Sequence, residues 1–198
     1  MIDTIIFDLG RVLLKFDWES HLKRLGASAE AITALRAGMF EHADWAEVDR
    51  GVLTKEEALH RFLERLPEYS ELVTAVYNTL YDTVEPYDYA MQWVKALKEK
   101  GYRVLYLSNY GEWSYEQSKK HMDFMKYMDG GLFSYELKLL KPQKYIYAEL
   151  AERFQLEPKN CVFLDDSQKN VEGARQYGMN AIWFQNYEQA EKELQEMI

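Results

Sequence analysis

The sequence contains a single cysteine and no long apolar run. Cys161 has no partner for an internal disulfide bond, which excludes a disulfide-stabilised scaffold and favours a reducing compartment. Because it lies within the apolar run CVFL, we expect its thiol to be buried. No stretch approaches the roughly 18 consecutive apolar residues of a transmembrane helix, and the amino terminus lacks a basic region followed by an apolar one. We therefore predict a cytoplasmic protein.

Basic residues are also in short supply. The chain has 24 Lys and Arg against 33 Asp and Glu, a net charge of −9. Nucleic acids and anionic membranes are bound by a surplus of Lys and Arg, so neither is expected as a partner. An anionic ligand must instead meet a local positive site. The composition leaves both a monomer and a homodimer open.

The remaining composition is that of an ordinary globular protein. Hydrophobic residues make up 47% and charged residues 29% of the 198 residues. This length allows one substantial domain, or one domain with a smaller inserted lobe.

Residues 4–17, TIIFDLGRVLLKFD, contain the first candidate site residue. The short, β-branched apolar run before Asp8 predicts a buried strand that opens into a loop at Gly10. Ligands of open α/β sheets bind at the carboxyl ends of strands, where Asp8 would lie. From this stretch alone, an aspartate that caps a turn is an equally good interpretation.

Residues 18–85 are predicted to be helical throughout. Apolar residues recur at intervals of three and four in residues 18–25, 29–40, 55–66 and 69–81. Thr54 and Glu57 form a capping box that marks one helix start.

From Pro86 onward, helices and strands alternate. Helices are predicted at 87–100, 114–127, 143–154, 168–177 and 187–197, and strands at VLYLSN, LFSY, CVFLDD and AIWF. This alternation predicts an α/β fold, a Rossmann-like parallel sheet with helices on both faces. Residues 1–17 and 86–198 would form this catalytic core, and residues 18–85 an α-helical cap inserted after the first strand.

Polar residues follow several of these predicted strands. Ser108 and Asn109 end the second strand, Asp165 and Asp166 end the fourth, and Lys141 precedes the helix between them. In a parallel sheet these residues converge with the aspartate of the first strand. Three clustered carboxylates repel each other, which favours a hard divalent cation such as Mg²⁺, while the amine, hydroxyl and amide can bind an anion. The set is typical of phosphoryl transfer.

The sequence also resembles a known family. FDLGRVLL, LSN, KPQKYIY and FLDDSQKNVEGA resemble, in order and spacing, the four motifs of the haloacid dehalogenase-like (HAD) hydrolases. The resemblance covers essentially the whole chain, including the inserted helical cap. It is greatest to the sugar-phosphate phosphatases similar to α-D-glucose-1-phosphate phosphatase, which also read DLG.

The resemblance implies a Mg²⁺-dependent phosphatase of a small phosphorylated metabolite, such as a sugar phosphate. Asp8 would be the nucleophile that forms an aspartyl-phosphate. Ser108 and Asn109 would bind the phosphoryl oxygens, and Lys141 would steady both nucleophile and phosphate.

The resemblance also implies a metal site. Asp166 would ligate Mg²⁺ together with Asp8 and the main-chain carbonyl of Gly10. Asp165 would ligate the ion or orient its neighbours.

Gly10 is a departure from the family pattern. Most phosphatases of the family carry at this position an aspartate that serves as general acid and base, help worth about 10²–10⁴ in rate. Asp17 or a residue of the cap is a candidate replacement, and Arg11 faces either substrate or solvent.

Two alternatives remain. A metal-independent 2-haloacid dehalogenase would use Asp8 to attack carbon, although Asp165 and Asp166 are then unexplained. A catalytically weak protein that binds a phosphorylated metabolite for regulation would explain Gly10.

Overall fold

The computed structural model describes residues 1–198, apart from the side chain of Tyr81, and its centre is a parallel sheet. The strands lie in the order β5-β4-β1-β6-β7, so the first strand of the chain is central. All neighbours in this sheet are parallel. The strands are β1 (Thr4–Phe7), β4 (Arg103–Ser108), β5 (Gly130–Phe133), β6 (Cys161–Asp165) and β7 (Asn180–Trp183).

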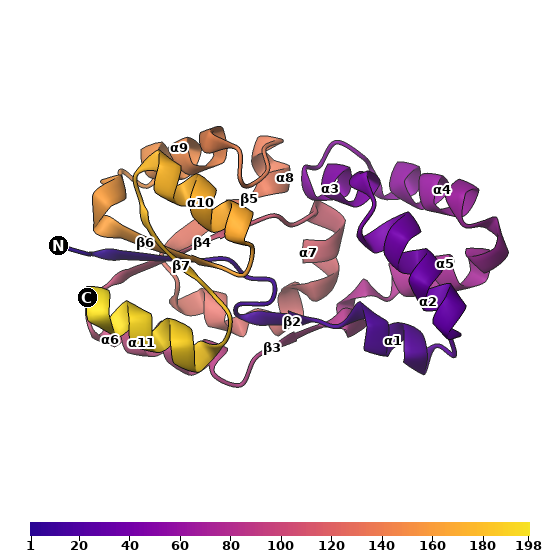
Figure 1. The fold of residues 1–198 in the computed structure, drawn as a ribbon, viewed down its shortest axis with the longest axis horizontal. Coiled ribbons are helices and arrows are strands. Elements are labelled where there is room, and N and C mark those ends of the chain that lie inside the picture. Colours follow the sequence, from indigo (N-terminus) through magenta and orange to yellow (C-terminus); the bar gives the residue numbers. More distant parts are fainter.

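Helices cover both faces of this sheet (Figure 1). On one face α6 (Ala90–Glu99) and α11 (Tyr187–Met197) contribute to the core, and on the other α9 (Lys144–Arg153) and α10 (Gln168–Tyr177). The predicted α/β fold with a parallel sheet and helices on both faces is therefore confirmed.

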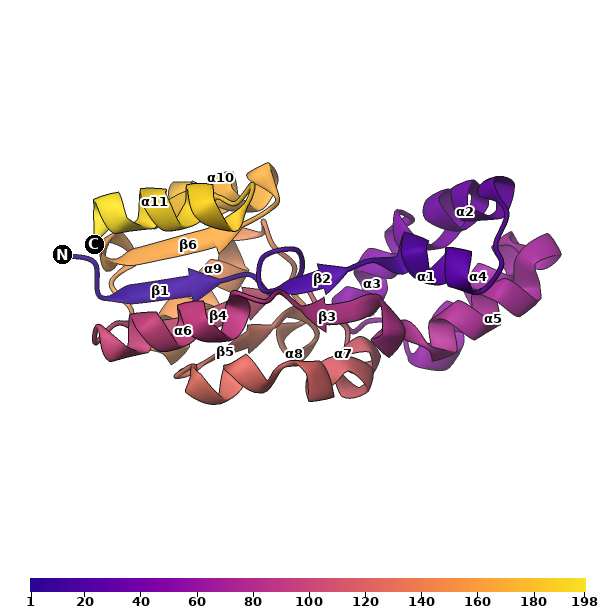
Figure 2. The same ribbon diagram turned by 90° about the horizontal axis from the view of Figure 1, so that it is seen from below.

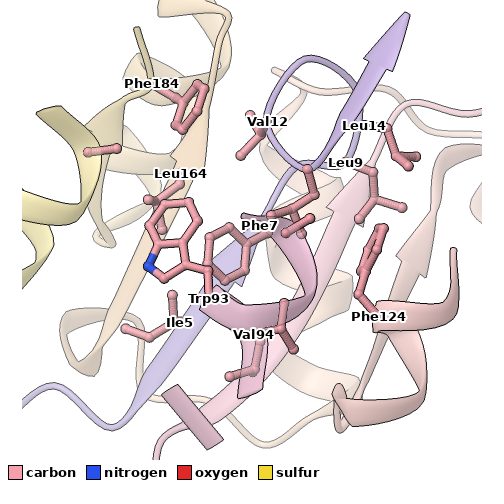
Figure 3. Close-up of a cluster of buried hydrophobic side chains, with 14 of the residues drawn as sticks. Ile5, Phe7, Leu9, Val12, Leu14, Trp93, Val94, Phe124, Leu164 and Phe184 are labelled. Carbon is pink, nitrogen blue, oxygen red and sulfur yellow. The ribbon is translucent and has the colours of Figure 1, made fainter. Parts of the chain in front are cut away.

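The alternation of side chains along β1 divides the core in two. Ile5 and Phe7 belong to the cluster under α6 and α11, while Ile6 belongs to the cluster under α9 and α10. Phe7 packs edge-on against Trp93 (Figure 3), and the ring centroids are 4.8 Å apart. Because β1 is covered on both faces, the run Ile5, Ile6 and Phe7 is buried on both sides, as predicted. Cys161 is fully buried, as predicted, and burial raises the pKa of its thiol to about 12.

Gly131 gives the fold its sharpest steric constraint. It pairs with Tyr106 across β4 and β5, and a Cβ at this position would overlap the backbone oxygen and ring of Tyr106. We expect Gly131→Ala to lower the free energy of unfolding by about 1–3 kcal/mol, measured by urea denaturation. Gly10→Ala is the matched control, because a Cβ there meets nothing within 4 Å. Equal stability of the two variants would contradict this packing.

A helical lobe, residues 18–83, lies at one end of the core (Figure 1). It has its own apolar cluster, which includes Leu22, Met39, Phe62 and Tyr77. The helices are α1 (Trp18–Arg24), α2 (Ala29–Leu35), a π-helical turn (Arg36–Phe40), α3 (Ala43–Asp49), α4 (Lys55–Arg65) and α5 (Ser70–Asn78), with 3₁₀ turns at Pro67–Tyr69 and Leu80–Thr83.

The capping box at the start of α4 is confirmed. The Thr54 hydroxyl accepts a hydrogen bond from the Glu57 N–H, and the Glu57 carboxylate accepts one from the Thr54 N–H.

Two short strands join the lobe to the core. β2 (Leu14–Phe16) and β3 (Val84–Pro86) pair antiparallel, so the chain leaves and re-enters the core side by side (Figure 2). The prediction that residues 18–85 are helical throughout is wrong at Val84 and Glu85, where the backbone is extended to pair with β2. The division of the chain into a core and an inserted cap at residues 17 and 86 stays a prediction.

The segment between β4 and β5 is less regular than predicted. α7 (Glu112–Ser118) ends early, and 3₁₀ turns follow at Lys119–His121 and Asp123–Tyr127. The Ser118 hydroxyl bonds back to the Ser114 carbonyl, an alternative to continued helix. After β5 come α8 (Ser134–Leu137) and, before β6, a 3₁₀ turn at Pro158–Asn160. Among the described residues, no helix has the length and apolar character needed to cross a membrane.

Candidate active site

The candidate site lies where the strand connections diverge. The chain passes from β1 to β4 on one side of the sheet and from β6 to β7 on the other, so the loops after β1 and β6 part and leave a crevice. A cavity of about 290 Å³ opens there. Both the core and the helical lobe line it, with Asp8, Gly10, Ser108, Asn109, Lys141 and Asp166 from the core and Trp45 and Asp49 from the lobe.

Asp8 follows β1 and is held from both sides. Its N–H donates to the Leu164 carbonyl at 2.8 Å, which extends the pairing with β6 by one residue. Its Oδ1 accepts a hydrogen bond from the Ser108 hydroxyl at 2.7 Å and lies 2.8 Å from Lys141 Nζ. Burial raises the pKa of Asp8 to about 6, although the Lys141 ammonium opposes the rise.

Lys141 is a buried ammonium, only 4% exposed, with each of its donors used. Nζ lies 2.7 Å from Asp165 Oδ2, 2.8 Å from Asp8 Oδ1 and 2.8 Å from the Leu107 carbonyl. Burial alone would lower its pKa, but Asp165 and Asp8 outweigh burial and raise it. The ammonium is therefore a fixed positive charge beside Asp8.

Asn109 contacts the main chain of Lys141. Its Oδ1 accepts from the Lys141 N–H at 2.9 Å, and its Nδ2 donates to the Lys141 carbonyl at 3.2 Å. This pair of bonds fixes the loop that carries Lys141. The expected contact of Asn109 with a phosphoryl group stays a prediction.

The two aspartates after β6 have different surroundings. Asp165 is fully buried, and its oxygens accept from Lys141, the Ser167 N–H and the Asn170 amide. Asp166 has a side chain that is 28% exposed, lines the cavity and lies 3.8 Å from Arg11. Asp165 therefore orients the ammonium, while Asp166 faces the open space.

The residues present fit a divalent cation. Asp8, Asp165 and Asp166 each place a carboxylate oxygen within 4.8 Å of the others. Burial raises the pKa of Asp166 and the neighbouring Asp165 adds to the rise, while Arg11 and Lys141 oppose it, so these cations do not offset burial and the crowded negative charge. Carboxylate oxygens are the donors that hard cations prefer.

Position 10 contributes no side chain to this cavity. Gly10 stands in a tight turn in which Arg11 takes a left-handed conformation, with φ 61°, and donates its N–H to the Leu14 carbonyl. The Arg11 side chain is 61% exposed. Asp17 caps α1, because its side chain accepts a hydrogen bond from the Ser20 N–H. Hydrogen bonding to Ser20 lowers the pKa of Asp17, so this candidate proton donor serves instead as a helix cap.

Sequence reasoning missed several polar residues of the site, among them Asn170 and Asp49. Asn170 holds Asp165 and lines the cavity, and its only signal is its place in the first turn of the helix after DDS. Asp49 ends α3 and lines the cavity from the lobe. No local pattern in the sequence marks it.

Comparisons with known proteins agree with this architecture. A family model for haloacid dehalogenase-like hydrolases matches residues 2–178. (S)-2-haloacid dehalogenase 4A of Burkholderia cepacia is 26% identical over 92% of the chain and 84% of that protein. Flavin mononucleotide hydrolase 1 of Arabidopsis thaliana is 23% identical over 77% of the chain and 61% of that protein.

A solved structure gives the same fold. An HAD family enzyme of Bacteroides thetaiotaomicron, in complex with magnesium and inorganic phosphate, matches with a TM-score of 0.72 and 22% identity over 92% of the chain and 93% of that structure. At this identity the likeness shows the fold alone.

Proposed function

The chain belongs to the haloacid dehalogenase-like hydrolases, and we propose that it is a Mg²⁺-dependent phosphatase of a small phosphorylated metabolite, such as a sugar phosphate. Asp8 is the nucleophile in this proposal, and an aspartyl-phosphate is the intermediate.

The observation that supports this function most is the excess of carboxylates around one buried ammonium. Asp165 balances Lys141, and Asp8 and Asp166 then share a cavity whose other basic residues, Arg11 and Lys15, have largely exposed side chains. One buried and one half-buried carboxylate that share a cavity are costly to maintain without a cation. Phosphoryl transfer through an aspartyl-phosphate accounts for that arrangement, because it uses both a cation and a nucleophilic carboxylate.

The geometry of Asp8 suits in-line attack on phosphorus. Ser108 and Lys141 both contact Oδ1, which fixes the carboxylate and leaves Oδ2 without a hydrogen bond from the described residues. We assign the attack to Oδ2. The new bond joins Oδ2 to phosphorus while the ester oxygen departs, and water then attacks phosphorus to release phosphate and restore the carboxylate.

Asp8, Asp166 and the Gly10 carbonyl would hold Mg²⁺, with Asp165 beside them. When bound, the ion would neutralise phosphoryl oxygens that carboxylates otherwise repel. Lys141 supplies a second positive charge from the protein itself, and Asn109 keeps its loop in place.

A 2-haloacid dehalogenase is the second candidate, because a relative that covers most of the chain carries that name. Asp8 would then attack carbon and displace halide without a metal. Asp166 weighs against this reaction, because a second carboxylate that lines the cavity disfavours both a carboxylate substrate and a departing halide.

A panel of phosphate esters separates these functions. We expect wild-type protein to release phosphate from p-nitrophenyl phosphate, hexose phosphates or flavin mononucleotide. Chelation with EDTA should lower the rate by about 10²-fold or more, and added Mg²⁺ should restore it. Phosphate assays on the same samples measure both.

Other outcomes contradict this proposal in different ways. Chloride release from 2-chloropropionate in EDTA would identify a dehalogenase. One equivalent of phosphate per protein, without further turnover, would identify a binding or regulatory protein.

A further inference from the structure

We propose that Asp49, from the helical lobe, is the general acid and base that position 10 lacks. The inference rests on the phosphatase function proposed above. The Asp49 carboxyl donates its proton to the ester oxygen as the bond from that oxygen to phosphorus breaks. The resulting carboxylate takes a proton from water as the water oxygen attacks the aspartyl-phosphate, so ester and water give alcohol and phosphate, and Asp49 ends protonated.

The position of Asp49 suits this role. It lines the cavity that Asp8 also lines, but it comes from α3 in the lobe, whereas Asp8 comes from the core. In-line transfer places the leaving group opposite the nucleophile. An ester with its phosphorus beside Asp8 therefore directs its leaving oxygen away from the core, toward the lobe.

Specific contacts hold the end of α3 against the core. The Ser134 hydroxyl at the start of α8 donates to the Asp49 carbonyl, and Lys138 Nζ donates to the Gly51 carbonyl. Figure 1 shows α3 and α8 next to each other. Gly111 approaches Val48 so closely that an added Cβ would lie 3.0 Å from its side chain. The placement of Asp49 thus depends on contacts between lobe and core.

Asp49 is chemically distinct from its neighbour Asp44 in the same helix. Asp44 forms ion pairs with Arg61 and Arg65, whereas no ion pair involves Asp49 in the described part of the chain. Burial raises the pKa of Asp49 well above its ordinary value, and the negative charge of Asp8 adds to this, while a Gly111 N–H bond and Lys141 oppose it. A raised pKa favours the protonated carboxyl, which is the form that a general acid needs.

The other acidic groups of the cavity have different roles. Of the acids that line it, Asp8 attacks and Asp166 faces the cation site, which leaves Asp49. Tyr110 also lines the cavity, but burial raises its pKa and its hydroxyl bonds to Ser118.

Asp49→Asn tests the proposal with two leaving groups. With p-nitrophenyl phosphate, whose leaving group needs no proton, we expect a burst of one nitrophenolate per protein and then slow turnover, because the intermediate lacks a base. With an alkyl phosphate, we expect the first step itself to slow by about 10²–10⁴-fold. Rapid-quench kinetics with Mg²⁺ present measure both.

A second variant tests for rescue. A Cβ at Gly10 meets nothing within 4 Å, so Asp49→Asn can be combined with Gly10→Asp, which restores an acid at the family position. We expect the double variant to regain at least about tenfold in alkyl phosphate hydrolysis over Asp49→Asn alone. Glu47→Gln, in the same helix but outside the cavity, is the control and should match wild type.

Three outcomes overturn the proposal. Asp49→Asn with wild-type rates on both esters would show that Asp49 transfers no proton. Equal losses on both esters, with no burst and no rescue, would indicate a structural role. If wild-type protein hydrolyses no ester, the proposed function fails and the role of Asp49 fails with it.

Discussion

Replacement of Asp8 by asparagine is expected to abolish turnover while the protein stays folded. An amide cannot form the aspartyl-phosphate, so we expect phosphate release to fall by on the order of 10⁴-fold or more, the scale of nucleophile removal. Burial raises the pKa of Asp8 to about 6, so the protein stabilises the uncharged form more than water does. The melting temperature should therefore be unchanged or higher. Phosphate assays and thermal unfolding measure the two effects.

Asp88→Asn is the control for this experiment, because Asp88 is an exposed aspartate of the core. It should leave both rate and melting temperature at wild-type values. Acid-stable labelling should also differ, since wild-type protein quenched during turnover carries phosphate and the Asp8 variant does not. Residual turnover within tenfold of wild type would exclude Asp8 as the nucleophile.

The parallel core could be predicted from the sequence because its strands are apolar at successive positions. Thr4–Phe7 and Cys161–Asp165 are buried throughout, and this pattern requires cover on both faces. The helices at 168–177 and 187–197 begin and end as predicted, since Gly178 ends the first in a left-handed conformation and Asn186 caps the second.

Short elements escaped prediction because tertiary contacts form them. Leu14–Phe16 and Val84–Pro86 have three residues each, too few for a period, and become strands only by pairing with each other. Ala43–Asp49 lies within the stretch predicted to be helical, but only Asp44 and Val48 of its seven residues are buried, so no apolar stripe marks where this helix begins and ends.

The residues of the site also fall into those that the sequence predicts and those that tertiary contacts bring there. Asp8, Ser108 and Asp166 lie at ends of adjacent parallel strands, so topology alone predicts that they meet. Asp49 reaches the same cavity from a separate helical lobe, and the contacts that carry it join residues distant in sequence, such as Asp49 and Ser134. Sequence spacing contains no signal for such a contact.

Lys141→Met is expected to be the most destabilising change in the site. It removes the cation that lies 2.7 Å from the fully buried Asp165 and 2.8 Å from Asp8. The loss of one partner from a buried ion pair costs about 3–5 kcal/mol, because the remaining charge stays desolvated. We expect a loss of this size in urea unfolding, together with loss of phosphatase activity.

Two companion variants distinguish charge from packing. Lys159→Met removes a lysine whose side chain is 76% exposed, 3.9 Å from Glu157, and should change stability by less than about 1 kcal/mol. Lys141→Met combined with Asp165→Asn should be more stable than Lys141→Met alone, since the unpaired charge is removed. If the double variant is less stable than the single one, the loss comes from packing.

The pH dependence of stability gives an independent check on the role of the Lys141 ammonium. Lys141 opposes the rise in the pKa of Asp8, so its removal raises that pKa beyond about 6. A raised folded-state pKa means that the folded protein binds the proton more tightly than the unfolded chain, so stability falls as pH rises through this range. In Lys141→Met this fall moves to higher pH. The difference in unfolding free energy from wild type should therefore be smaller at pH 5 than at pH 8, whereas a packing defect would cost the same at both.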